Sequence, residues 1–168
     1  MKRLLISLAI VTVLIATIVM PATAEVVGTD AYVTVTEFIS VSIADVNSDG
    51  VRFGELAQGA TDQPDVAQST GDDLTPAVTI TIAGTTNVNC DINIKGTDFH
   101  TTIPISNAKW ALRHDDPKTP MDTDYDSMAT DVTPGTAVGV WHFLTIPGTA
   151  AGGDHSSTFT YEVVASSP

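Results

Sequence analysis

Thr86-Asn87-Val88-Asn89-Cys90-Asp91-Ile92-Asn93-Ile94 is the stretch that decides the fold class of this chain. Apolar and polar side chains alternate along it, with Val88, Cys90, Ile92 and Ile94 on one side. Such alternation is typical of an antiparallel strand that has one buried face and one wet face. The stretch therefore predicts a strand, with Cys90 as a small buried core residue.

The segment from Val33 to Ile43 alternates in the same way, with Glu37 as the one charged exception on its apolar side. Further predicted strands cover residues 51–56, 77–83, 99–105, 108–112, 137–146 and 157–164. The stretches 58–75 and 114–136 are polar and are predicted to be loops. About eight strands without helical periodicity predict an all-β fold, an antiparallel sandwich or a barrel.

The segment 137–146 differs from the others because it is apolar on both faces. Trp141 and Phe143 lie on one side, opposite Val140 and Leu144. Such a strand is either central in its sheet, or it presents one face to a partner. In the second case Trp141 and Phe143 are interface residues.

The N-terminus has the features of an export signal. Lys2 and Arg3 precede an apolar run over residues 4–20, Pro21 follows, and Ala22-Thr23-Ala24 supplies small residues for cleavage before Glu25. The pattern predicts a signal peptide over residues 1–24, a secreted or cell-surface location, and no membrane contact after cleavage. The alternative is an uncleaved anchor, since the apolar run is long enough for one.

Charge narrows the classes of partner. The chain has 7 Lys and Arg against 20 Asp and Glu, and two of the basic residues lie in the predicted signal, which leaves a formal charge of 5 − 20 = −15. Nucleic acids and anionic lipid surfaces repel such a protein. Cys90 is the single cysteine, so no intramolecular disulfide can form.

Calcium is the one cofactor that the residues suggest, and none is required. Asp45, Asn47 and Asp49 alternate ahead of Gly50, as oxygen ligands do at the start of a calcium loop. Leu56 stands where the full pattern needs a bidentate Glu, so the alternative is a polar hairpin turn. Asp122, Asp124 and Asp126 form a second candidate, whose alternative is a solvated loop.

Catalysis has no support in the sequence. The four histidines are scattered, and neither a zinc signature nor a nucleophile motif is present. The chain is therefore expected not to be an enzyme.

Three segments together resemble a known family. Ile39–Ile43 followed by Val51-Arg-Phe53-Gly54-Glu-Leu56-Ala-Gln-Gly59 is similar to the opening of the TasA and camelysin-like secreted proteins. The stretch from Thr86 to Phe99, with Ile105-Ser-Asn107 and Trp110, resembles archaeal members of that group, whose subunits form bundling pili. The segment 146–152 resembles a closing hairpin of extracellular sandwiches.

The resemblance implies a jelly-roll-like sandwich over residues 37–168 and a homopolymer, a filament, pilus or biofilm matrix built by strand donation. Residues 25–36 would be the donor strand, with Val33 and Val35 filling alternate pockets of the next subunit. The alternative is a long first strand kept within its own domain. The competing function is a monomeric secreted module that binds calcium or a glycan.

Overall fold

The computed structural model describes residues 36–45, 50–66 and 75–167. The chain divides into two compact units, residues 1–35 and Thr36–Pro168, and the description below concerns the second. The predicted signal peptide, the predicted donor residues Val33 and Val35, and the candidate ligands Asn47 and Asp49 lie outside the described residues. Within the described ranges, no helix has the length and apolar character that crossing a membrane would need.

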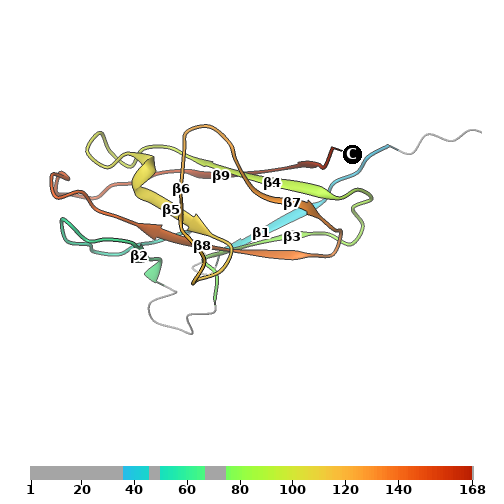
Figure 1. The fold of residues 1–168 in the computed structure, drawn as a ribbon, viewed down its shortest axis with the longest axis horizontal. Helices are drawn as coiled ribbons and strands as arrows, with labels where there is room; N and C mark the ends of the chain where they lie inside the picture. The colour runs from blue at the N-terminus through green and yellow to red at the C-terminus, as the bar shows by residue number, and fades with distance from the viewer. Residues whose placement is uncertain (1–35, 46–49, 67–74, 168) are drawn as a thin grey trace, which may run out of the picture. The chain divides into compact units, whose positions relative to one another are not determined.

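Two antiparallel sheets form a β-sandwich, which confirms the predicted all-β class (Figure 1). The larger sheet has the order β1-β3-β8-β5-β6, and β2 pairs with the end of β8. The smaller sheet has the order β7-β4-β9. The larger sheet consists of β1 (Val41–Asp45), β2 (Gln63–Pro64), β3 (Val78–Ile82), β5 (Ala108–Ala111), β6 (Thr119–Pro120) and β8 (Ala137–Leu144). The smaller sheet consists of β4 (Cys90–Gly96), β7 (Asp126–Val132) and β9 (Phe159–Ala165), and a short 3-10 turn, η1 (Ile105–Asn107), precedes β5.

The core lies between the sheets, where alternate residues of each strand meet. In β4 buried residues alternate with half-buried ones, and Cys90, Ile92 and Ile94 are fully buried. In β3 Ile80 and Ile82 are fully buried in the same way. The predicted alternation and the predicted burial of Cys90 are therefore confirmed.

Three predicted segments differ from the structure. Residues 51–56 form no strand, because Gly54 adopts a φ of +67° that interrupts the extended backbone. Residues 99–105 turn back on themselves, since the backbone N–H groups of His100 and Ile103 each donate to the other's carbonyl before η1 begins. The predicted loop 114–136 contains β7, in which Met128 and Val132 are buried.

The strand β8 is central, with β3 on one side and β5 on the other. Phe143 lies on the outer face but is only 2% exposed, because this chain's own residues 114–118 cover it. The His114 ring lies 5.9 Å from the Phe143 ring, and Lys118 Nζ lies 4.1 Å from the ring centre. Phe143 is thus covered by residues of its own chain, whereas Trp141 on the same face is half-buried.

The two ends of the sandwich differ (Figure 1). At one end, called the arm end below, Thr36 and Phe38 are held by Asn87, whose side chain donates to the Thr36 carbonyl and accepts from the Phe38 N–H. Ser166, which follows β9, also lies there and donates its N–H to the carbonyl of Asn89. At the other end, the cavity end, lie the loops around residues 55–60, 99–103 and 147–155.

Candidate functional site

One side of the sandwich is open, along β1. Val41 pairs with Ile82, and Ile43 pairs with Ile80. Directly opposed residues place their side chains on the same face of a sheet, so Val41 and Ile43 face the core side. Yet they are 42% and 49% exposed, whereas Ile80 and Ile82 are fully buried. The larger sheet therefore extends past the smaller one, and the inner face of β1 is left uncovered.

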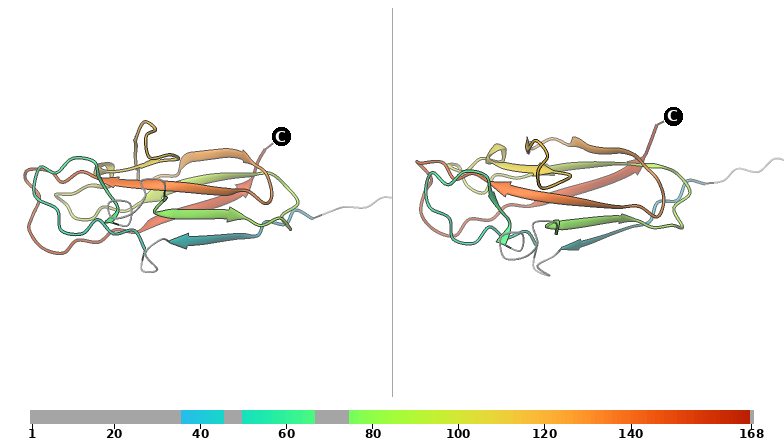
Figure 2. Two further views of the ribbon diagram at one scale, coloured as in Figure 1. Left: turned by 90° about the horizontal axis from the view of Figure 1, so that it is seen from below. Right: turned by 60° about the horizontal axis from the view of Figure 1, so that its bottom comes forward.

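The strand β9 is the edge of the smaller sheet on this open side. Tyr161 of β9 bonds to His142 of β8, and burial, followed by the charge of Asp45 at the end of β1, raises the pKa of Tyr161. Figure 2 places β1 at the outer margin of its sheet, next to β3. A single further strand beside β9 would therefore cover Val41 and Ile43. The name open slot is used below for this space between the free edge of β9 and the inner face of β1.

The two edges of the smaller sheet differ in how they are protected. The strand β7 pairs with β4 through two register shifts, and Asp131 within it has a positive φ of 56°. Bulges and charged residues of this kind obstruct the addition of another strand. The strand β9 pairs with β4 in unbroken register from Phe159 to Ala165, and β4 is its single strand partner in the described part of the chain. The regular, unprotected edge is thus the one that borders the open slot.

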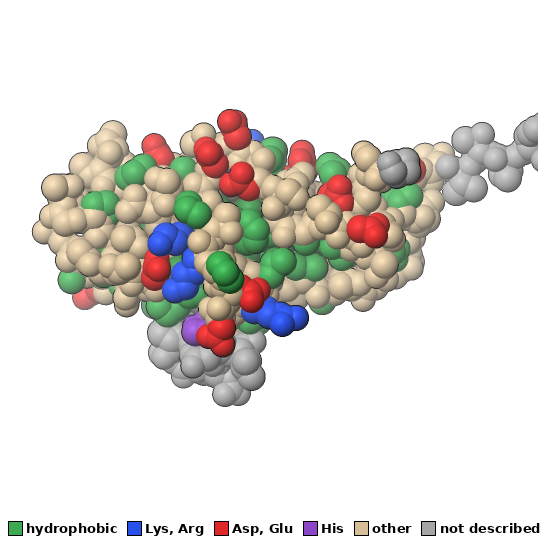
Figure 3. All heavy atoms as spheres, in the orientation of Figure 1, with side chains coloured by type: hydrophobic (Ala, Val, Ile, Leu, Met, Phe, Trp, Pro, Cys, Tyr) green, Lys and Arg blue, Asp and Glu red, His purple; other side chains and the backbone are tan. Residues whose placement is uncertain are grey.

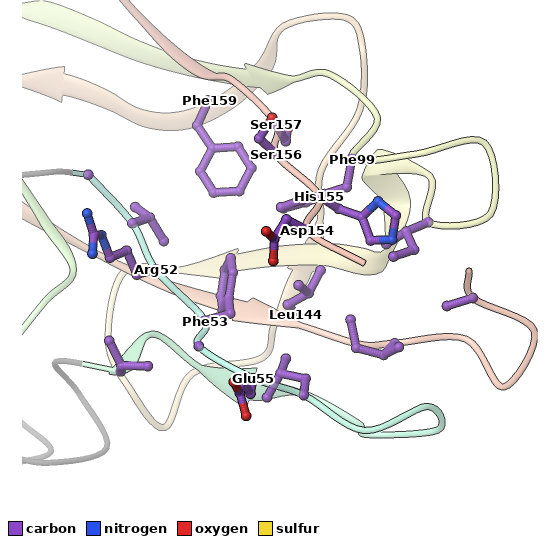
Figure 4. A pocket seen from close by; sticks show the side chains of 18 of the residues that line it. Arg52, Phe53, Glu55, Phe99, Leu144, Asp154, His155, Ser156, Ser157 and Phe159 are labelled. Atoms are coloured by element: carbon purple, nitrogen blue, oxygen red, sulfur yellow. The ribbon is translucent and has the colours of Figure 1, made fainter. Parts of the chain in front are cut away.

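A cavity of about 1290 Å³ continues the open slot toward the cavity end (Figure 4). One wall is the segment from Gly50 to Leu56, and the other runs from Gly152 through the first residues of β9. Asp45 and Tyr161 line it as well, so the cavity adjoins both β1 and β9. Its lining includes the exposed acidic residues Glu55 and Asp154 and the apolar residues Leu144, which is buried, and Ile146, which is half-buried.

Aromatic rings link the two walls of the cavity. Phe53 and Phe159 extend from opposite walls toward the space between them (Figure 4). Phe99 meets both rings edge to face, at centroid distances of 6.3 Å from Phe53 and 6.0 Å from Phe159. Such geometry is favourable for aromatic pairs. The cluster connects the two walls and contributes apolar surface to the cavity.

A buried polar pair lies behind Phe159. His142 Nε2 lies 2.6 Å from the Tyr161 hydroxyl, and the His142 ring stacks on Phe159 at 4.9 Å. Burial lowers the pKa of His142 from 6.5 to about 3 and raises the pKa of Tyr161. His142 is therefore neutral at physiological pH. Its Nδ1 atom has no hydrogen-bond partner among the residues that the structure describes.

The predicted calcium ligands are not assembled in the described residues. Asp122 Oδ1 accepts hydrogen bonds from the Thr123 N–H and hydroxyl, which lower the pKa of Asp122, and Asp126 lies in β7 opposite Ile94. Asp45 ends β1 and is exposed. No group of three or more His, Cys, Asp or Glu side chains in the described ranges is placed to hold a metal ion. On the face seen in Figure 3, several acidic side chains gather at the upper margin, and others are spread among neutral ones.

The tryptophans do not form an exposed platform for a sugar. Trp110 is 7% exposed, and the Nε1 atom of Trp141 is buried. The aromatic residues that do line an accessible space are Phe53, Phe99, Phe159 and Tyr161, none of which the sequence analysis treated as a site residue. Phe53 and Phe159 carried a partial signal, since each lies in a segment with alternating apolar residues.

Neither the family models nor the curated proteins give a match to this chain.

Proposed function

We propose that this chain is a secreted structural subunit of an extracellular filament, pilus or biofilm matrix, which polymerises by strand donation between copies. The proposed role is mechanical and involves no catalysis. The observation that carries it is the open slot, where an unprotected regular edge borders an uncovered apolar sheet face.

Exposed apolar side chains beside a free edge make a protein prone to pair with other chains, which is a disadvantage for a protein that stays monomeric. Natural sandwiches protect such edges with charges, prolines or bulges, because an unprotected edge pairs with other chains. The edge strand β7 is interrupted by two register shifts, whereas β9 pairs with β4 and β1 pairs with β3 in unbroken register, each with a single acidic residue, Glu162 and Asp45. The absence of bulges on one side favours assembly through that side.

The separation of the two ends supports a filament over a closed dimer. Thr36, to which residues 25–35 connect, lies at the arm end, and the cavity opens at the opposite end. A contact between unlike ends of two copies is heterologous, and such contacts propagate into open chains unless a rotation closes them. Head-to-tail addition is therefore the geometry that this subunit favours.

Electron microscopy of the purified secreted protein tests the proposal. We expect filaments from the full chain, and folded subunits without filaments after deletion of residues 25–36. Circular dichroism of the deletion variant provides the control for folding. A full chain that sediments as a stable monomer at all concentrations would show that the proposal is wrong and would favour a monomeric binding module.

A further inference from the structure

The open slot and the cavity together have the form of a receptor for one extended chain segment. We propose that residues 25–35 of a second copy, called the arm below, occupy the open slot antiparallel to β9, with the C-terminal half of the arm over the phenylalanine-lined cavity. This inference rests on the proposed function and adds the receptor and the direction of the arm.

The size of the space favours a peptide over a small ligand. Pockets for small molecules measure about 300–1,000 Å³. The cavity alone is larger, at about 1290 Å³, and it continues into the slot over β1. The seven residues of β9 extend over roughly 23 Å at 3.3 Å per residue. The eleven residues 25–35 reach at most about 36–40 Å, so the arm can follow all of β9 and still bridge to its own domain.

The backbone of β9 is arranged to receive a strand. Thr158 and Ser166 direct their backbone groups toward the β4 side, through bonds with Thr97 and Asn89. Because these directions alternate along a strand, the N–H and C=O groups of Tyr161, Val163 and Ala165 point to the free edge. A strand added there gains main-chain hydrogen bonds, and its side chains gain apolar contacts on one face.

The direction of the arm follows from the two ends of the sandwich. The strand β9 runs from the cavity end, where Phe159 lies, to the arm end, where Ser166 bonds to Asn89. An arm that leaves the arm end of one copy enters the next copy at its cavity end, with its N-terminus leading. Its chain direction is therefore opposite to that of β9, which gives the antiparallel pairing of the rest of the smaller sheet.

The antiparallel direction determines which part of the receptor each side chain of the arm would contact. Four of the six odd-numbered arm residues, Val27, Ala31, Val33 and Val35, are apolar and would share the inner face with Glu25 and Thr29. Val33 and Val35 are at the C-terminal end of the arm, next to Thr36. They would therefore lie near Phe53 and Phe159 at the cavity end. Val27 would lie near Val41 of β1. Each uncovered apolar surface thus receives an apolar side chain.

A matched pair of substitutions on β1 tests the receptor. Ile43→Lys places a charge on the inner face, inside the slot, and Ser42→Lys places the same charge on the outer face. Both positions are exposed in the monomer, so both variants should fold. We expect Ile43→Lys to raise the critical concentration for filament growth at least about tenfold, equivalent to about 1.4 kcal/mol. We expect Ser42→Lys to leave it within about twofold, since exposed surface changes have small effects.

Photo-cross-linking in filaments of the full chain tests the direction. A benzophenone amino acid replaces Val35 in one variant and Val27 in another, and filaments are grown from mixed isotope-labelled and unlabelled chains. We expect adducts between chains, from position 35 to residues 152–159 and from position 27 to residues 163–166. The reversed pattern would overturn the antiparallel direction. Adducts confined to single chains would show that each arm occupies its own slot.

These outcomes separate the two proposals. Normal filaments from Ile43→Lys would overturn the open slot as the receptor and leave the filament function standing. Absence of filaments from the unmodified chain would instead overturn the filament function itself.

Discussion

His142 of β8 and Tyr161 of β9 join the two sheets across the core, with 2.6 Å between His142 Nε2 and the tyrosine hydroxyl. His142 is fully buried, and no ion pair compensates a charge on it in the described part of the chain. Protonation would therefore place an uncompensated positive charge in the core. The pair makes the sandwich sensitive to acid.

We expect the free energy of unfolding to fall as the pH drops below about 6.5. The pKa of His142 is about 3 in the folded chain against 6.5 ordinarily, so the unfolded chain binds more protons between these values. Stability is therefore fully present above pH 6.5 and declines toward pH 3, by up to about 1.4 kcal/mol per pH unit. Chemical denaturation between pH 7 and pH 5 measures this slope.

Two variants show whether His142 is responsible. His142→Gln should flatten the slope between pH 7 and pH 5, because Gln does not titrate. His155→Gln, at the cavity end, is the control and should retain it, since His155 is only partly buried. An unchanged slope in His142→Gln would mean that another group causes the acid sensitivity.

Cys90 should resist thiol reagents in the folded protein. Its side chain is fully buried, and burial, followed by the charge of Asp91, raises the pKa of the thiol. The reactive thiolate is therefore scarce and inaccessible. Labelling should become rapid only in denaturant, and rapid labelling of the native protein would contradict the position of Cys90 in the core.

Substitution of the same residue tests its packing. Cys90→Val should fold, with a loss of less than about 1.5 kcal/mol, because the change keeps a small apolar side chain. Cys90→Asp should prevent folding, since it would bury an unpaired charge.

The strands with regular alternation were the ones that the sequence predicted well. Residues 78–82 and 90–96 follow the two-residue period, because each packs one face on the facing sheet in unbroken succession. The strand β7 did not follow it. Its register shifts against β4 place Met128 and Val132 in the core four residues apart, with Asp131 in a left-handed conformation between them. A bulged strand has no simple period, so its acidic composition resembled that of a loop.

The candidate site was less predictable than the fold. The open slot depends on which sheet each strand joins, and consecutive strands such as β7, β8 and β9 lie in alternate sheets. No local pattern in the sequence specifies that order. The exposed inner face of Val41 and Ile43 has the same sequence alternation as the buried face of Ile80 and Ile82. Val41 and Ile43 are exposed, and Ile80 and Ile82 are buried, because the smaller sheet ends at β9 and does not reach β1.

The aspartates of residues 122–126 should not contribute to calcium binding. Asp122 already bonds to Thr123, and these carboxylates do not form a metal-binding group. We expect the triple variant with Asn at positions 122, 124 and 126 to show the same change in melting temperature on addition of EDTA as the parent protein. Loss of an EDTA effect in the triple variant would restore this stretch as a calcium site, since a ligand bound only by the native state raises its stability.

Two phenylalanines near opposite ends of the chain's second unit offer a matched test of the aromatic cluster. Phe53 meets Phe99 edge to face and packs on the core, whereas Phe38 is 53% exposed at the arm end. We expect Phe53→Ala to lower the free energy of unfolding by about 2 kcal/mol, less than the roughly 3–5 kcal/mol of a fully buried phenylalanine, because Phe53 is half-buried. Phe38→Ala should cost less than about 0.5 kcal/mol, as exposed positions do. Urea unfolding measures both values, and equal losses would mean that the Phe53–Phe99–Phe159 cluster does not hold the cavity walls together.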